Sequence, residues 1–118
     1  MTLRKVGRID SLGPKIFLGS GTDDLASVCL TAPDKGKDFN GQTRDILAVI
    51  DKHMAELGVG RDRLLTVQVW LADIGDYSAF VGIWNAWVGE DVPGLSVVEM
   101  AASRRDSLLE IRAWSAPG

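Results

Sequence analysis

Apolar and polar residues recur with two different periods along the chain, and these periods predict its strands and helices. Period-2 alternation predicts strands at residues 15–21, 25–32, 64–73, 95–102 and 108–115. Apolar residues spaced three and four apart predict two amphipathic helices, which end at Gly58 and Gly89. Asp38 or Asn40 is expected to cap the first helix and Asp76 the second.

The predicted order of elements is β-β-α-β-α-β-β, in a single domain that spans residues 1–118. Two amphipathic helices can cover only one face of such a sheet. The predicted fold class is therefore α+β, with two layers and two helices on one face of a mixed sheet. The other face must meet solvent or another subunit.

The last two strands predict what lies on that other face. Leu109, Ile111 and Ala113 form the side of the last strand that is expected to meet the helices. The opposite side is assigned to two sets of residues: Leu108, Glu110, Arg112 and Trp114 on the last strand, with Leu95, Val97 and Glu99 on the strand before it. Such a surface is too apolar for open water and too charged for a monomer core, so it indicates a subunit interface.

Composition and charge narrow the classes of function. The chain has 118 residues, a net charge of -3, one cysteine and one histidine. An acidic chain without a basic stripe is not expected to bind nucleic acid. No apolar run approaches the ~20 residues of a membrane span, and the first residues lack the apolar core of a signal peptide. We therefore expect a cytoplasmic protein without a membrane partner.

The single cysteine and histidine also limit the chemistry. They are too few for a zinc site built from His and Cys, so no metal is expected. Cys29 lies on a predicted strand and is interpreted as a small buried hydrophobe. His53 lies at the edge of the apolar stripe of the first helix and is interpreted as structural.

Four segments carry recognisable motifs. They are GQTRDILAVIDKHMAELG with its Q-T-R opening, LLTVQVWLADIGDYSAFVGIWNAWV, PGLSVVEMA and LLEIRAW. In this order they resemble the Rid family, the reactive-intermediate deaminases also called the YjgF family, over nearly the whole chain. The third and fourth are similar to the family's P-A-R-S-x-V-E-V-A and V-E-I-E-A strands.

The resemblance implies a chorismate-mutase-like fold that assembles as a homotrimeric barrel, with its sheets turned inward. It implies small-molecule sites in the clefts between subunits. The implied activity is hydrolysis of reactive enamines or imines, such as 2-aminoacrylate, to a keto acid and ammonia. The resemblance implies no cofactor for this reaction.

The family's site residues are only partly present. Glu110 matches the glutamate that orients or activates the attacking water, and it is the candidate catalytic residue. The arginine that grips the substrate carboxylate falls on Leu95, which cannot do so, although the following serine is present as Ser96. Standard 2-aminoacrylate deaminase activity is therefore expected to be weak or absent.

Other positions also depart from the family pattern. The family's helix asparagine falls on Val81, and the glycine after the second strand falls on Thr31 or Ala32. Arg112 stands where a second glutamate is usual, so it is either a relocated anion clamp or an interface ion-pair partner. Trp114 either walls the pocket or packs at the interface. Two functions remain open: a small-molecule enzyme with an altered pocket, and a non-catalytic binding or scaffold protein that retains the trimer.

Overall fold

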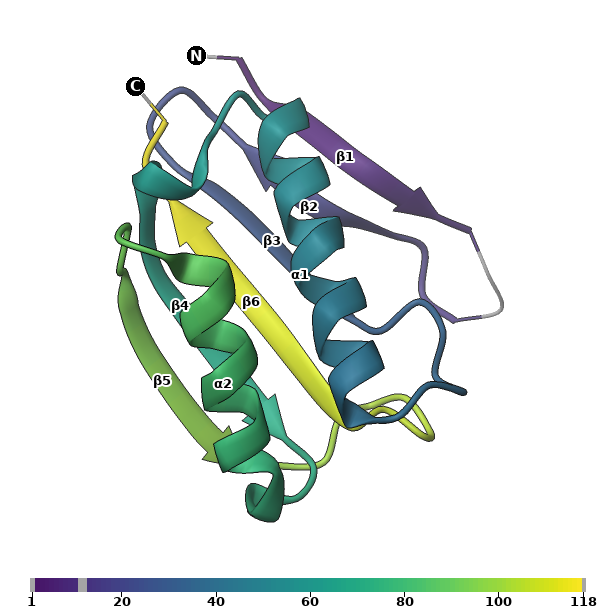
Figure 1. Cartoon of the computed structure of the whole chain (residues 1–118). Coiled ribbons are helices and arrows are strands. Elements are labelled where there is room, and N and C mark those ends of the chain that lie inside the picture. The colour runs from purple at the N-terminus through teal and green to yellow at the C-terminus, as the bar shows by residue number, and fades with distance from the viewer. Residues whose placement is uncertain (1, 11–12, 118) are drawn as a thin grey trace.

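The structure is a computed structural model that describes residues 2–10 and 13–117. It confirms the predicted α+β class: two helices cover one face of a six-stranded mixed sheet (Figure 1). The strands are β1 (Arg4–Ile9), β2 (Ile16–Gly21), β3 (Ala26–Thr31), β4 (Leu64–Leu71), β5 (Gly94–Glu99) and β6 (Leu109–Ser115). They lie in the order β1-β2-β3-β6-β4-β5, antiparallel except for the parallel pair β4 and β5.

Helix α1 (Phe39–Glu56) packs on β1, β3 and β6, and α2 (Tyr77–Val88) lies beside it over β4, β5 and β6 (Figure 1). Asp38 caps α1 as expected, because its Oδ1 accepts from the Gly41 amide at 2.8 Å. Gly58, with φ of +81°, follows the last turn of α1. Short 3-10 turns, η1 (Arg61–Arg63) and η2 (Ile74–Asp76), precede β4 and α2.

The expected cap of α2 is wrong in its detail. Asp76 occupies the N-cap position, but its side chain makes no capping hydrogen bond. Asp73 instead caps the preceding turn η2, because its carboxylate accepts from the Gly75 amide at 2.8 Å. Gly89 ends α2 with φ of +60°, as the sequence predicts.

One strand of the sheet was missed by the sequence pattern. β1 forms one edge of the sheet, opposite the edge formed by β5, and carries three basic residues, Arg4, Lys5 and Arg8, so it lacks a clear apolar alternation. Charged side chains are common on edge strands because they discourage pairing with other chains. The observed order is therefore β-β-β-α-β-α-β-β.

The predicted face of β5 is wrong. Leu95 pairs with Val67 in β4, and Val67 pairs with Ala113 in β6. Residues paired in register project to the same side of a sheet. Three residues of β5 therefore share the helix-covered side with Ala113, not the opposite side with Glu110: Leu95, Val97 and Glu99.

Other contacts agree with this placement. The Glu99 carboxylate accepts from the Ile74 amide at 2.8 Å, at the start of the turn that leads into α2. β5 ends at Glu99 rather than at residue 102. Leu108 precedes β6 and packs against the core instead of extending the uncovered face.

The core lies between the sheet and the two helices. On β6, Leu109, Ile111 and Ala113 are fully buried, as the alternation predicts, and Glu110, Arg112 and Trp114 are only partly buried. His53 is buried on α1 and contacts Glu56 in the next turn, in agreement with a structural role. Within residues 2–10 and 13–117, no helix is both long and apolar enough to cross a membrane.

Gly7 should be required for the edge strand to pack. Its φ is +70°, and a Cβ atom there would lie 2.9 Å from Nε2 of His53. Gly7→Ala should lower the free energy of unfolding by about 1–2 kcal/mol. Gly82→Ala is the control, because a Cβ atom on Gly82 meets nothing within 4 Å and should raise stability by up to ~1 kcal/mol. Urea unfolding measures both, and equal effects would contradict this account.

Candidate functional site

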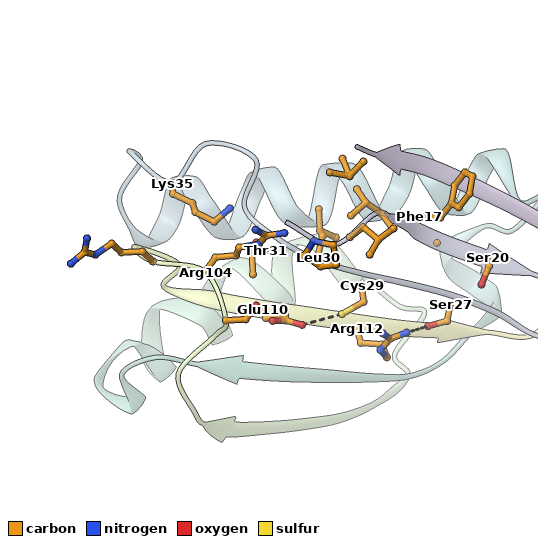
Figure 2. Close-up of a pocket in the computed structure, with 17 residues that line it drawn as sticks. Phe17, Ser20, Ser27, Cys29, Leu30, Thr31, Lys35, Arg104, Glu110 and Arg112 are labelled. Carbon is orange, nitrogen blue, oxygen red and sulfur yellow. Dashed lines mark hydrogen bonds between the residues drawn. The ribbon is translucent and has the colours of Figure 1, made fainter. Parts of the chain in front are cut away.

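A concavity of about 750 Å³ opens where the helices leave the sheet uncovered (Figure 2). Side chains of β2, β3 and β6 line it, together with residues from the loop after β3 and the loop between β5 and β6. The strands supply a rigid floor, because each is paired on both sides. The loops supply one end of the wall.

Two neighbouring strands place the polar side chains of the floor next to each other. The register between β3 and β6 pairs Ser27 with Trp114, Cys29 with Arg112, and Thr31 with Glu110. Because paired residues project to the same side, these six side chains share the uncovered face. The site is thus built by alternation along two strands.

Glu110 and Cys29 form one hydrogen bond of the floor. The Cys29 thiol donates to Oε2 of Glu110 at 3.3 Å (Figure 2). Burial raises the pKa of Cys29 from an ordinary value of 9.0 to about 12; Glu110 acts in the same direction and Arg112 opposes it. A thiol that stays protonated at neutral pH is a donor and not a nucleophile.

This contact also corrects the interpretation of Cys29. The residue is only partly buried and lies on the polar face of β3, not in the hydrophobic core. Val28 and Leu30, its neighbours in the chain, are the core residues of this strand.

Arg112 is held in place from two sides. Its Nη1 donates to Oγ of Ser27 at 2.8 Å, and its guanidinium lies 5.6 Å from the centroid of the Trp114 ring. Two residues on one side of a strand are about 6–7 Å apart along the backbone, so Arg112 and Glu110 are neighbouring opposite charges.

The loops add further cations to the wall. Nζ of Lys35 donates to the carbonyl of Ala32 at 2.7 Å. Burial, and secondarily the charge of Arg104, lowers the pKa of Lys35. Among the described lining residues, four are cationic and one is acidic: Lys35, Arg104, Arg105 and Arg112, against Glu110. This composition favours an anionic ligand.

The structure brings together only some of the residues that the sequence singled out. Glu110, Arg112 and Thr31 line the concavity, and Trp114 supports Arg112 from beside it. Ala32 is fully buried at its edge and offers only its carbonyl, to Lys35.

Three other predicted residues lie elsewhere in this chain. Leu95 and Ser96 are on β5, which β4 separates from β6. Val81 is on α2, across the sheet from the concavity.

Sequence reasoning missed four residues of the site. Ser27 and Cys29 alternate with Thr31 along β3, so the same period-2 rule would have placed all three on one face. Lys35 and Arg104 lie in loops 69 positions apart, and no local pattern predicts that they meet. In the part of the chain that the structure describes, no three His, Cys, Asp or Glu side chains are grouped as metal ligands would be.

Known proteins share this fold and parts of this sequence. A crystal structure of NMB1025 from Neisseria meningitidis, a member of the YjgF protein family, is 28% identical with a TM-score of 0.86, covering 100% of this chain and 97% of that one. Rv2704 from Mycobacterium tuberculosis has the same fold, with a TM-score of 0.84 at 21% identity, covering 98% of this chain and 99% of that one.

Sequence relatives cover shorter stretches. A RutC family protein of Haemophilus ducreyi is 30% identical over 79 residues, which are 66% of this chain and 68% of that protein. One from Haemophilus influenzae is 38% identical over 52 residues, 44% of this chain and 45% of that protein. The chain thus spans about half to two thirds of the length of these relatives. A family model described as Endoribonuclease L-PSP matches residues 28–116. The chain therefore belongs to this family, whose members include the YjgF and RutC proteins.

Proposed function

We propose that the concavity binds a small metabolite and that Glu110 carries out acid–base chemistry there, hydrolysing an enamine or imine to a carbonyl compound and ammonia. Family membership supports a small-molecule-binding or deaminase-like role. The observation that carries the proposal is the setting of Glu110. It is the single carboxylate among the described lining residues, and it stands on a strand paired on both sides.

The contacts of Glu110 suit a general base. Among the described residues, Oε2 accepts from Cys29 and Oε1 has no protein donor, so a water molecule can donate to it. A base must lie within hydrogen-bond reach of the proton that it removes.

The proposed reaction balances with water as the only co-reactant. Protonation of an enamine carbon, or of an imine nitrogen, by a proton from solvent gives the iminium ion. Glu110 takes a proton from water as the oxygen adds to the iminium carbon, and the nitrogen becomes a neutral amine. Glu110 then returns the proton to that nitrogen; the C–N bond breaks with its electron pair leaving on ammonia, and the remaining hydroxyl loses its proton as the carbonyl forms.

We also propose that the protein acts as a homotrimer whose subunits meet through the uncovered sheet face. That face carries aromatic and aliphatic side chains that are not buried within one chain: Trp70, Val98 and Trp114. An exposed apolar surface rimmed by charges is typical of an interface. Leu95, Ser96 and Val81 contribute to the site only if a neighbouring copy brings its own β5 and α2 to the concavity.

The alternative function is a binding or scaffold protein without turnover. It is supported by Leu95, which replaces the residue that would hold a substrate carboxylate in the family pattern. Both functions use the same concavity, and they differ in whether Glu110 is needed for chemistry or only for packing.

Glu110→Gln should abolish hydrolysis and leave assembly intact. The substitution keeps the size of the side chain but removes the base, so turnover of imines generated in situ should fall by about 10²–10⁴-fold. Ammonia release from a panel of imines, with 2-aminoacrylate as the reference, measures this. The wild-type protein should process the reference poorly because of Leu95.

Glu90→Gln is the control, because Glu90 is exposed beyond the end of α2 and far from β6 in the chain. If no imine in the panel is turned over by the wild-type protein, the binding-protein alternative replaces the enzyme. Equal turnover by the wild-type protein and Glu110→Gln would remove Glu110 from the mechanism.

Cys29 should make the folded protein sensitive to alkaline pH. Its pKa is raised from 9.0 to about 12, so above pH 9 the unfolded chain releases a proton that the folded chain retains. Stability from this residue is complete below pH 9 and is lost as the pH rises toward 12. The loss can reach at most about 1.4 kcal/mol per pH unit, and partial solvation of Cys29 reduces it.

The melting temperature of the wild-type protein should therefore fall more steeply between pH 8.5 and 10.5 than that of Cys29→Ala. Every other side chain is the same in both proteins, so the difference between them isolates the thiol. If the melting temperatures of the two proteins fell equally with pH, the pKa of Cys29 would not be raised in the folded state.

Trp114→Asp should weaken the assembly. It replaces an aromatic ring with a carboxylate in the proposed interface, and burying such a charge is costly. Light scattering at micromolar concentration should show a trimer for the wild-type protein and smaller species for the variant. Asn85→Asp adds the same charge on an exposed position of α2 and should stay trimeric. A wild-type monomer would contradict the proposed interface.

A further inference from the structure

Two cations from different loops converge at one end of the concavity. Lys35 belongs to the loop between β3 and α1, and Arg104 to the loop between β5 and β6. Figure 2 shows their side chains approaching each other beside Thr31. The effect of Arg104 on the pKa of Lys35 reflects the same proximity. Two like charges are thus held together in a site that a ligand can enter.

A buried amide holds these two loops together. Gln42 on α1 is only 1% exposed. Its Nε2 lies 3.3 Å from the carbonyl oxygen of Lys35, 3.1 Å from that of Lys37 and 3.2 Å from that of Asp106, and donates to them. Its Oε1 accepts from the Leu108 amide at 3.0 Å. Gln42 belongs to the Q-T-R opening of the first helix, and here it fixes the backbone on both sides of the cation pair.

Further contacts limit the freedom of each cation. Nζ of Lys35 is anchored on the Ala32 carbonyl, which leaves its two other protons for a ligand. A Cβ atom on Gly13 would lie 2.8 Å from Nη1 of Arg104, so the guanidinium packs closely against the chain between β1 and β2. Asp106 has φ of +64°, a left-handed conformation that turns the loop carrying Arg104 back toward β6.

No acidic side chain among the described residues forms an ion pair with Lys35 or Arg104. In the regions that the structure describes, the ion pairs are Arg8–Asp10, Lys37–Asp45, His53–Glu56 and Arg61–Asp51. Neither Lys35 nor Arg104 takes part in any of them. Arg112 differs, because it neighbours Glu110 on β6 and is bonded to Ser27. Arg105 follows Arg104 in the chain and also takes no part in these ion pairs. The uncompensated positive charge of the concavity is therefore concentrated at Lys35 and in the loop that carries Arg104 and Arg105.

We infer that Lys35 and Arg104 form the anion-binding point of the concavity and hold a carboxylate or phosphate group of the ligand. This point lies apart from Leu95, the position to which the family pattern assigns an arginine. The inference rests on one part of the proposed function, that the concavity binds a small ligand. It does not depend on the chemistry assigned to Glu110. A ligand anchored there extends along the β3–β6 floor and presents its other end to Glu110 and Cys29.

The guanidinium fork of Arg104 matches the two oxygens of a carboxylate, and the Lys35 ammonium adds a point charge. A carboxylate and a phosphate group would each contact this pair of cations differently. Pyruvate is therefore the carboxylate probe and inorganic phosphate is the phosphate probe. Propionamide, which is similar in size to pyruvate but uncharged, is the negative control.

The test is a titration of the full chain followed by ¹⁵N chemical shifts, at pH 7.5 in a zwitterionic buffer without chloride. One or both anions should bind, and propionamide should not. Arg104→Gln and Lys35→Gln should each weaken anion binding by about ten- to a hundredfold, the loss expected for a charge-assisted hydrogen bond. Lys37→Gln is the matched control, because it removes the same charge from the same loop at a residue paired with Asp45.

Each outcome bears on the inference. Unchanged affinity in Arg104→Gln and Lys35→Gln, an equal loss in Lys37→Gln, or no anion binding by the wild-type protein would overturn it. The Glu110→Gln variant distinguishes failure of the anion-binding inference from failure of the proposed reaction. If anions bind to the wild-type protein and to Glu110→Gln but no imine is hydrolysed, the anion point stands and the catalytic proposal fails. If imines are hydrolysed at wild-type rates by Arg104→Gln, the catalytic proposal stands and the anion point fails.

Discussion

The central strand β6 imposes the constraint on which the core and the site both depend. It is paired with β3 on one side and β4 on the other, so hydrogen bonds to two neighbouring strands fix its register. Alternate residues are fully buried under the helices, and Glu110, Arg112 and Trp114 face the other way. A slip by one residue would turn the carboxylate and guanidinium into the apolar core, where unpaired charges are strongly unfavourable. The packing that stabilises the sheet therefore also fixes the direction of the site residues.

The sequence predicted what depends on local periodicity. The helices, five of the six strands, and the shared direction of Glu110 and Arg112 follow from spacings within one element. The side of the sheet on which Leu95 lies does not follow from such spacings, because this segment is apolar on both sides. Leu95 and Val97 alternate with Ser96, Val98 and Met100. Only the register with β4 places Leu95 on the helix side. Pairing of parallel strands is set by the intervening turn and helix, which no pattern within β5 records.

The loop residues of the site illustrate a second limit. Gln42 could be noticed as part of a family motif, but its role depends on carbonyl groups as far away as Asp106. Buried amides must satisfy both their donors and their acceptor, and here the partners lie on two separate loops. The meeting of Lys35 with Arg104 follows from this tertiary arrangement. Such a site becomes visible only when the chain is folded, although every residue in it is ordinary in the sequence.

The distribution of charge connects these observations. On β3 and β6, which form the floor, each charged side chain has a neighbour that offsets or bonds it: Glu110 has Cys29 and Arg112, and Arg112 also has Ser27. Strand positions allow little change, because a substitution there also affects the packing of two neighbouring strands. Loops tolerate changes of charge more easily, since they pack less tightly. Under our proposal, a chain without an arginine at the start of β5 can thus keep a positive ligand pocket through Lys35 and Arg104. The floor would then supply the chemistry, and the loops would select the charge of the ligand.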